Sequence, residues 1–131
     1  MSNEDIRWKQ RFDNFTKALL QLQELIEKPE INKFERQGLI HCFEYTFEMA
    51  CKTIKDYLDY QGFSIKSTRM AIQTGFQTKL LKNGPVWIDA VEKRNLMART
   101  FDEIAASEAE QHIRTTYYGM LEELYQYFSA M

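Results

Sequence analysis

The chain has 131 residues, the usual length of a single domain, and 44% of them are hydrophobic, which is enough for a substantial core. Its 17 basic and 19 acidic residues give a formal net charge of −2. This balance argues against broad, sequence-independent binding to nucleic acid, because such binding needs a basic face, but it leaves a local basic pocket possible. No signal peptide and no apolar run of membrane length is evident, so we expect one cytoplasmic domain over residues 1–131, with no membrane association.

Residues 4–28 are predicted to form an amphipathic helix. Their apolar side chains recur at spacings of 4 and 3, which places them on one face of a helix, and the opposite face is charged and polar. The apolar stripe consists of Trp8, Phe12, Phe15, Leu19, Leu22 and Ile26. Pro29 lies just past the expected end of this helix.

A second long helix is predicted to run from a cap at Asn32 to Gly62. Glu35, three residues after Asn32, completes the pattern of a capping box. The inward stripe consists of Leu39, Phe43, Phe47, Ala50, Ile54 and Tyr57. Cys42 and Cys51 are nine positions apart on this helix, so they face opposite directions and cannot form a disulfide. Two long helices joined by a few residues predict an antiparallel hairpin.

The second half of the chain is predicted to contain three more helices. One covers residues 68–81, although Gly75 inside it costs about 1 kcal/mol relative to alanine. The stop at Asn83-Gly84-Pro85 precedes a fourth helix, which begins near Pro85 or Val86, and Asp102 is suited to cap a fifth that runs to the C-terminus. No segment alternates like a strand. We therefore expect an all-α fold, an antiparallel bundle of four or five helices.

Charged and polar side chains gather in residues 93–103, where helical periodicity falters. Arg94 and Arg99 could both contact one anionic group, such as a phosphate. Alternatively, Arg94 ties a helix end through an ion pair with a carboxylate such as Glu92 or Asp102. From the residues alone, the ion pair is the favoured interpretation.

Glu44, Glu48 and Lys52 share one face of the second helix. They could line a polar pocket, or they could form a solvated face with an ion pair between residues four apart, worth a few tenths of a kcal/mol. The spacing alone favours the solvated face.

Several kinds of chemistry have no counterpart in the sequence. There is no glycine-rich phosphate loop and no Cys or His group with metal-ligand spacing. His41 and His112 stand alone on different predicted helices, and Ser107 and Ser129 have no neighbouring base in the sequence. We therefore expect no metal and no cofactor, and we assign no catalytic residue.

Two segments carry a family resemblance. Residues 43–48 and 52–58 resemble the second-helix signature of the nucleotidyltransferase substrate-binding proteins, small helical proteins of the HEPN superfamily that are close to the HepT toxins. Residues 94–96 and 100–103 resemble the second signature of this family. The resemblance covers nearly the whole chain. It implies a HEPN-like bundle that pairs as a homodimer through its long helices, and a minimal nucleotidyltransferase as its partner.

The resemblance also identifies two departures from the motif. In many relatives the second signature contains Arg, four residues, His, one residue and Tyr; the Arg and His of both subunits form a metal-independent ribonuclease site, and the partner adenylates the Tyr. Arg94 matches the first position, but Arg99 replaces the His and Phe101 replaces the Tyr. Arginine stays protonated and cannot act as a general base near neutral pH, and phenylalanine has no hydroxyl to modify.

We therefore expect a non-catalytic subunit that presents a nucleotide, RNA or another substrate to a nucleotidyltransferase, in a homodimer whose cleft is cationic. The expected binding residues are Glu48, Lys52, Arg94, Asn95, Arg99, Thr100 and Asp102. The enzyme alternative is a HepT-like toxin ribonuclease of a toxin–antitoxin pair, in which Arg94 acts with a substitute base such as His41 or a carboxylate. A third interpretation is a purely structural bundle without a ligand.

Overall fold

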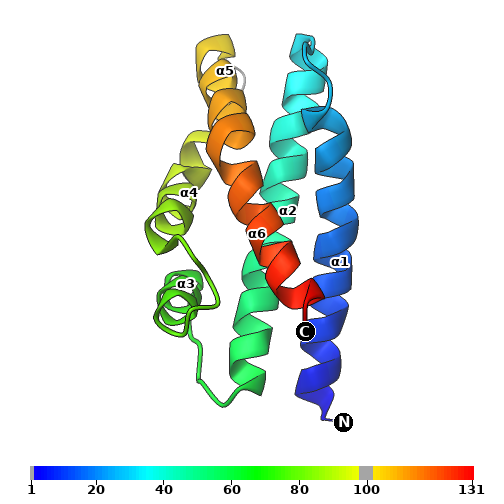
Figure 1. The fold of residues 1–131 in the computed structure, drawn as a ribbon. Coiled ribbons are helices and arrows are strands. Elements are labelled where there is room, and N and C mark those ends of the chain that lie inside the picture. The colour runs from blue at the N-terminus through cyan, green and yellow to red at the C-terminus, as the bar shows by residue number, and fades with distance from the viewer. Residues whose placement is uncertain (1, 98–101) are drawn as a thin grey trace.

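The computed structural model describes residues 2–97 and 102–131, and every regular element in this part of the chain is helical. Helices α1 and α2 form a long antiparallel hairpin, and the last three elements follow one another without a break as a further rod (Figure 1). The elements are α1 (Asn3–Ile26), α2 (Lys33–Tyr60), α3 (Thr68–Gln77), α4 (Gly84–Met97), α5 (Glu103–His112), the π-helix η1 (Ile113–Tyr117) and α6 (Tyr118–Ser129). The expected all-α bundle is confirmed.

The start of α2 is fixed by the predicted capping box. The side-chain oxygen of Asn32 accepts hydrogen bonds from the backbone N–H of Phe34 at 3.0 Å and of Glu35 at 2.8 Å. In return, Glu35 Oε1 accepts from the backbone N–H of Asn32 at 3.0 Å. A cap of this kind contributes about 1 kcal/mol, because it satisfies N–H groups that have no partner inside the helix.

Aromatic side chains join the later helices to α2. Phe43 stacks on Tyr117 of η1 with ring centroids 5.5 Å apart, and Phe47 stacks on Trp87 of α4 at 5.7 Å. Tyr117 and Trp87 are buried, with 0% and 2% of their surface exposed. Since α2 also packs along α1 in the hairpin, it is the central helix of the bundle.

Helix α3 ends at Gln77, so it is shorter than the predicted range of residues 68–81. The chain then turns through Lys79, whose φ of 66° lies in the left-handed region, and returns so that the N–H of Leu81 donates to the carbonyl of Gly75 at 3.1 Å. Leu81 is buried directly against Gly75, where an added Cβ would lie 3.2 Å from the leucine side chain. The glycine therefore accommodates the returning chain.

Helix α4 begins at Gly84, with Pro85 in its first turn, where a missing N–H costs nothing. It continues to Met97, so Arg94 and Asn95 lie in a regular helix and only the later part of the predicted bend lies beyond it. Asp102 caps α5 as predicted, because its Oδ1 accepts from the N–H of Ile104 at 2.9 Å.

The predicted fifth helix is interrupted. Its residues form α5, then the five residues of η1, and then α6, so a wider π-helical turn separates two α-helical parts. Within residues 2–97 and 102–131, no helix is both long enough and apolar enough to cross a membrane.

Candidate functional site: a cationic pocket

A pocket of about 170 Å³ lies where α2, α3 and α4 meet. Three basic side chains and one carboxylate line it, so we call it the cationic pocket. Its residues are Glu48, Cys51, Lys52 and Lys55 of α2, Thr68 of α3 and Arg94 of α4. The four α2 residues follow one another at helical spacings, so a single face of that helix forms one wall.

The stack of Phe47 on Trp87 holds α4 against α2 and thereby places Arg94. The guanidinium of Arg94 lies over the Phe47 ring, with 5.5 Å from its central carbon to the ring centroid. Among the residues that the structure describes, Arg94 forms no ion pair; Glu92 pairs instead with Arg69 at 3.4 Å. The guanidinium donors can therefore bind an external anion.

The two lysines of the pocket each have an acidic neighbour one turn away on α2. Lys52 Nζ lies 3.2 Å from Glu48, and Lys55 Nζ lies 2.8 Å from Asp59. Lys52 and Lys55 are 42% and 44% exposed. Exposed pairs of this kind contribute about 0–1 kcal/mol, so an anion in the pocket can compete with these carboxylates for the ammonium groups.

The cysteines carry no activated thiol. Burial raises the pKa of Cys51 to about 12, although the positive charge of Arg94 acts in the opposite direction. A thiol with this pKa stays neutral and is a poor nucleophile. Cys42 and Cys51 are both free, which confirms the prediction that they do not form a disulfide.

Comparison with known proteins identifies the family. The family model described as nucleotidyltransferase substrate binding protein like matches residues 10–130. The chain belongs to this family. A crystal structure of a protein from Thermus thermophilus is similar, with 27% sequence identity and a TM-score of 0.77 over 84% of this chain and 94% of that one. Among curated proteins, none matches.

The cationic pocket brings together three of the seven predicted binding residues. Glu48, Lys52 and Arg94 line it side by side. The predictions for the other four have different outcomes. Asp102 acts as the cap of α5, and Asn95 lies in the last turn of α4, where its side chain is outside the described part of the structure. Arg99 and Thr100 also lie outside the described residues, as does Phe101.

Sequence reasoning missed Lys55, Cys51 and Thr68. Lys55 lies three positions after Lys52, so the helical spacing that groups Glu48 with Lys52 could have included it. Thr68 had no such signal, because it reaches the pocket only through the way α3 packs on α2. No group of three or more His, Cys, Asp or Glu residues suited to a metal ion occurs in the described part of the chain.

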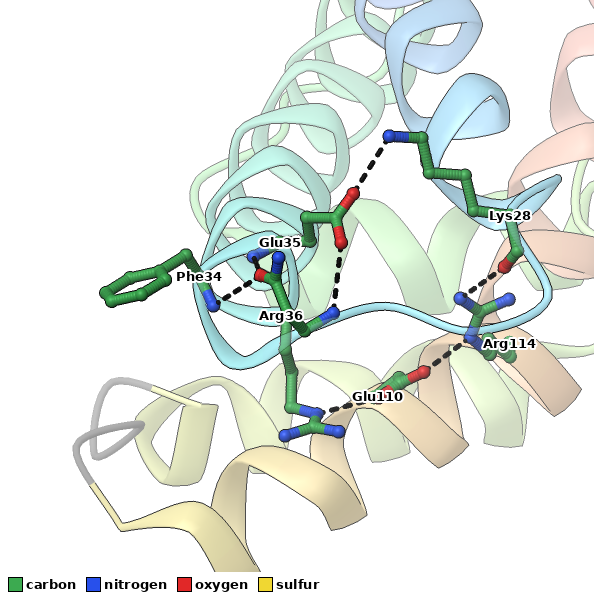
Figure 2. A network of polar contacts seen from close by, with 7 residues as sticks. Lys28, Phe34, Glu35, Arg36, Glu110 and Arg114 are labelled. Carbon is green, nitrogen blue, oxygen red and sulfur yellow. Dashed lines mark hydrogen bonds and ion pairs between the residues drawn. The ribbon is translucent and has the colours of Figure 1, made fainter.

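A second polar cluster joins the connection between α1 and α2 to the α5–η1 rod (Figure 2). Glu110 accepts hydrogen bonds from Arg36 Nε at 2.8 Å and from Arg114 Nε at 2.7 Å. Arg114 also donates to the backbone carbonyls of Ile26 and Lys28, both at 2.9 Å. Burial alone would raise the pKa of Glu110, but the hydrogen bonds from the two arginines outweigh it and lower this pKa. The cluster ties the start of α2 and the end of α1 to α5 and η1, and we interpret it as structural.

Proposed function

We propose that this chain is the non-catalytic substrate-binding subunit of a two-component nucleotidyltransferase, and that its cationic pocket binds a phosphate group of the nucleotide or RNA it presents. The observation that carries the proposal is the convergence of Lys52, Lys55 and Arg94 on one pocket, in a chain whose family match spans residues 10–130. Arg94 and Lys52 were among the binding residues expected from the family resemblance, and Lys55 adds a third positive charge.

The chemistry of these groups suits a phosphate. The guanidinium of Arg94 offers a planar set of donors. Because it already lies over the Phe47 ring, the Arg94 side chain loses less conformational freedom when it binds a ligand. The pocket volume of about 170 Å³ is below the range of about 300–1,000 Å³ that is typical for whole small-molecule ligands. A phosphate group therefore fits inside, and the nucleoside would extend toward the partner enzyme or a second copy of the chain.

The exposed face of α2 supports a homodimer. Phe34 and Tyr45 are 75% and 52% exposed, and His41 between them is also exposed. With spacings of 7, 4 and 3, these residues and Glu48 lie on one stripe of the helix. Exposed apolar side chains that gather along one face are typical of interaction surfaces. In the proposed dimer, two copies pair along this stripe, which leads directly into the cationic pocket at Glu48.

The ribonuclease alternative is less well supported, because no described side chain of the cationic pocket has the environment of a general base. None of the described side chains that line the pocket is a histidine, and His41 lies on the outer stripe of α2 instead. Glu48 lies in the same pocket as Arg94, but its side chain is 56% exposed and paired with Lys52. Carboxylates that act as general bases are typically buried away from such a counter-charge, so Glu48 lacks the environment of one.

The first experiment is purification of the tagged protein from its own host, with mass spectrometry of the proteins that accompany it. We expect a small nucleotidyltransferase.

Calorimetric titration of the complex with ATP then tests the pocket: Arg94→Gln should weaken binding about tenfold and Lys52→Gln about fivefold. Lys17→Gln is the matched control, because Lys17 also forms an exposed ion pair with an acid four residues away, at 3.3 Å from Asp13.

Two outcomes would overturn the proposal. One is ATP binding that Arg94→Gln and Lys17→Gln change equally. The other is metal-independent cleavage of RNA that disappears in Arg94→Gln, since this would establish the ribonuclease.

For the dimer, light scattering after size exclusion should give twice the mass of one chain for the wild type and the mass of a single chain for Tyr45→Glu. Phe63→Glu, at a 44% exposed position outside the stripe, should stay dimeric.

A further inference from the structure

A second and larger cavity lies between α3 and α4 and shares no residue with the cationic pocket. We call it the α3–α4 pocket. Its volume is about 420 Å³, which is within the usual range for sites of small organic ligands. Its walls combine apolar side chains with two carboxylates: Ile72, Phe76, Pro85 and Ile88, together with Asp89 and Glu92. In Figure 1, α3 and α4 lie on one side of the bundle and α1 on the other.

From this combination we infer that the α3–α4 pocket binds a small organic cation, an amine or quaternary ammonium compound with an apolar body. The lining includes two carboxylates and no basic side chain, so it favours a cationic ligand over an anionic one. Phe76 lines the pocket and is 47% exposed, and aromatic rings attract cations by about 0.5–1 kcal/mol at exposed sites. The apolar walls suit the remainder of such a ligand.

Side chains from outside the pocket already contact both carboxylates, but each carboxylate keeps acceptor positions for a ligand. Lys93 and the hydroxyl of Tyr117 both contact Oδ2 of Asp89, at 3.3 and 2.5 Å, and Arg69 contacts Oε1 of Glu92 at 3.4 Å. A carboxylate has about four lone-pair positions, so each can accept a further donor. The pair between Arg69 and Glu92 is also weak, since the two side chains are 50% and 59% exposed.

Gly84 at the start of α4 lies against Phe76 of α3 in the wall of the pocket. An added Cβ at this position would lie 2.6 Å from Cγ of Phe76, so the helices approach closely at this end. The hydrogen bond from Tyr117 fixes Asp89, which lies on α4 like Gly84. These two contacts position Phe76 and Asp89 without a ligand, and a site that is already ordered has a lower ordering cost of binding.

The test uses phenethylamine, the neutral 2-phenylethanol and the anionic phenylacetate, titrated into isotope-labelled protein while amide NMR shifts are recorded. We expect phenethylamine to shift the amides of Gln73, Phe76, Ile88 and Glu92, with an affinity at least about threefold higher than that of 2-phenylethanol. Phenylacetate should bind most weakly. Neither the nucleotidyltransferase nor a nucleotide is present, so the result is independent of the function proposed above.

Matched variants separate charge from apolar contact. Glu92→Gln should weaken phenethylamine binding about threefold and leave 2-phenylethanol unchanged, whereas Phe76→Ala should weaken both. The controls are Glu24→Gln, a carboxylate on α1, and Phe63→Ala, an exposed aromatic outside the pocket. Circular dichroism verifies that each variant is folded. The inference fails if phenethylamine binds no tighter than 2-phenylethanol, if the shifts lie outside the pocket, or if Glu24→Gln has the effect expected of Glu92→Gln.

Discussion

The carboxylate of Glu110 connects two arginines from different parts of the chain, and its replacement by glutamine tests how much this connection contributes to stability (Figure 2). Glutamine has nearly the same shape, but it is neutral and one of its two acceptor oxygens becomes an NH₂ donor. In Glu110→Gln, one arginine keeps a weaker hydrogen bond to the remaining oxygen, and the other faces a donor. Arg36 and Arg114 keep their positive charges.

The burial of the cluster sets the size of the effect. Glu110 is 16% exposed, and Arg36 and Arg114 are 22% and 21% exposed, so water can replace the lost interactions only in part. Hydrogen bonds to charged groups contribute about 1.5–3 kcal/mol each, and we expect a loss of about 2.5 kcal/mol. An unfolding entropy of about 2.1 cal/mol/K per residue converts this into a decrease in Tm of about 9 °C for this chain.

Urea and thermal unfolding at several pH values measure the effect. The pKa of Glu110 is lowered from its ordinary value of 4.5, so its stabilisation is fully present above pH 4.5 and is lost as the pH falls through the folded-state pKa. The gap between wild type and Glu110→Gln should therefore be largest near neutral pH and shrink in acid. Glu108→Gln, an exposed neighbour on α5, should change stability by less than about 0.5 kcal/mol. A gap below about 0.5 kcal/mol at neutral pH, or one that persists unchanged at low pH, would refute the reasoning.

Three further predictions concern individual contacts. Tyr117→Phe removes the hydrogen bond to Asp89 and should lower the free energy of unfolding by about 1–2 kcal/mol in urea titrations, because the carboxylate loses a donor. Gly84→Ala places a Cβ 2.6 Å from the Phe76 ring and should destabilise the protein by about 1–3 kcal/mol in the same assay. The thiol of Cys51, whose pKa is raised to about 12, should resist iodoacetamide in mildly alkaline buffer in the folded protein and react once urea unfolds it, as peptide mass spectrometry would report.

The long helices could be predicted from the sequence because their signals are local. The apolar stripe of α1 and the capping box at Asn32 depend on residues three or four positions apart, and the structure confirms both. The end of α3 could not be predicted in this way. It depends on Leu81 returning to pack on Gly75, a contact set by tertiary packing that overrides the helical preference of the intervening residues.

The same distinction applies to the candidate site. Glu48 and Lys52 could be paired from their spacing, but the spacing alone favoured a solvated face over a pocket. Arg94 was assigned to the site by the family resemblance. What the sequence lacked was the packing of Trp87 on Phe47, which brings Arg94 to the face of α2 that carries Glu48 and Lys52. Thr68 was missed for the same reason.

The π-helix could not be predicted from the spacing of apolar residues either, since the buried residues on either side of it keep α-helical spacings of 3 and 4. The π-helix sets the directions in which the side chains of Arg114 and Tyr117 point. In an α-helix, residues three apart lie on the same face. In the wider turn of η1, Arg114 reaches the carbonyls at the end of α1, while Tyr117 reaches Asp89 on α4. Because Asp89 lies on the helix that carries Arg94, this turn links the cluster at the α1–α2 connection to the position of the cationic pocket.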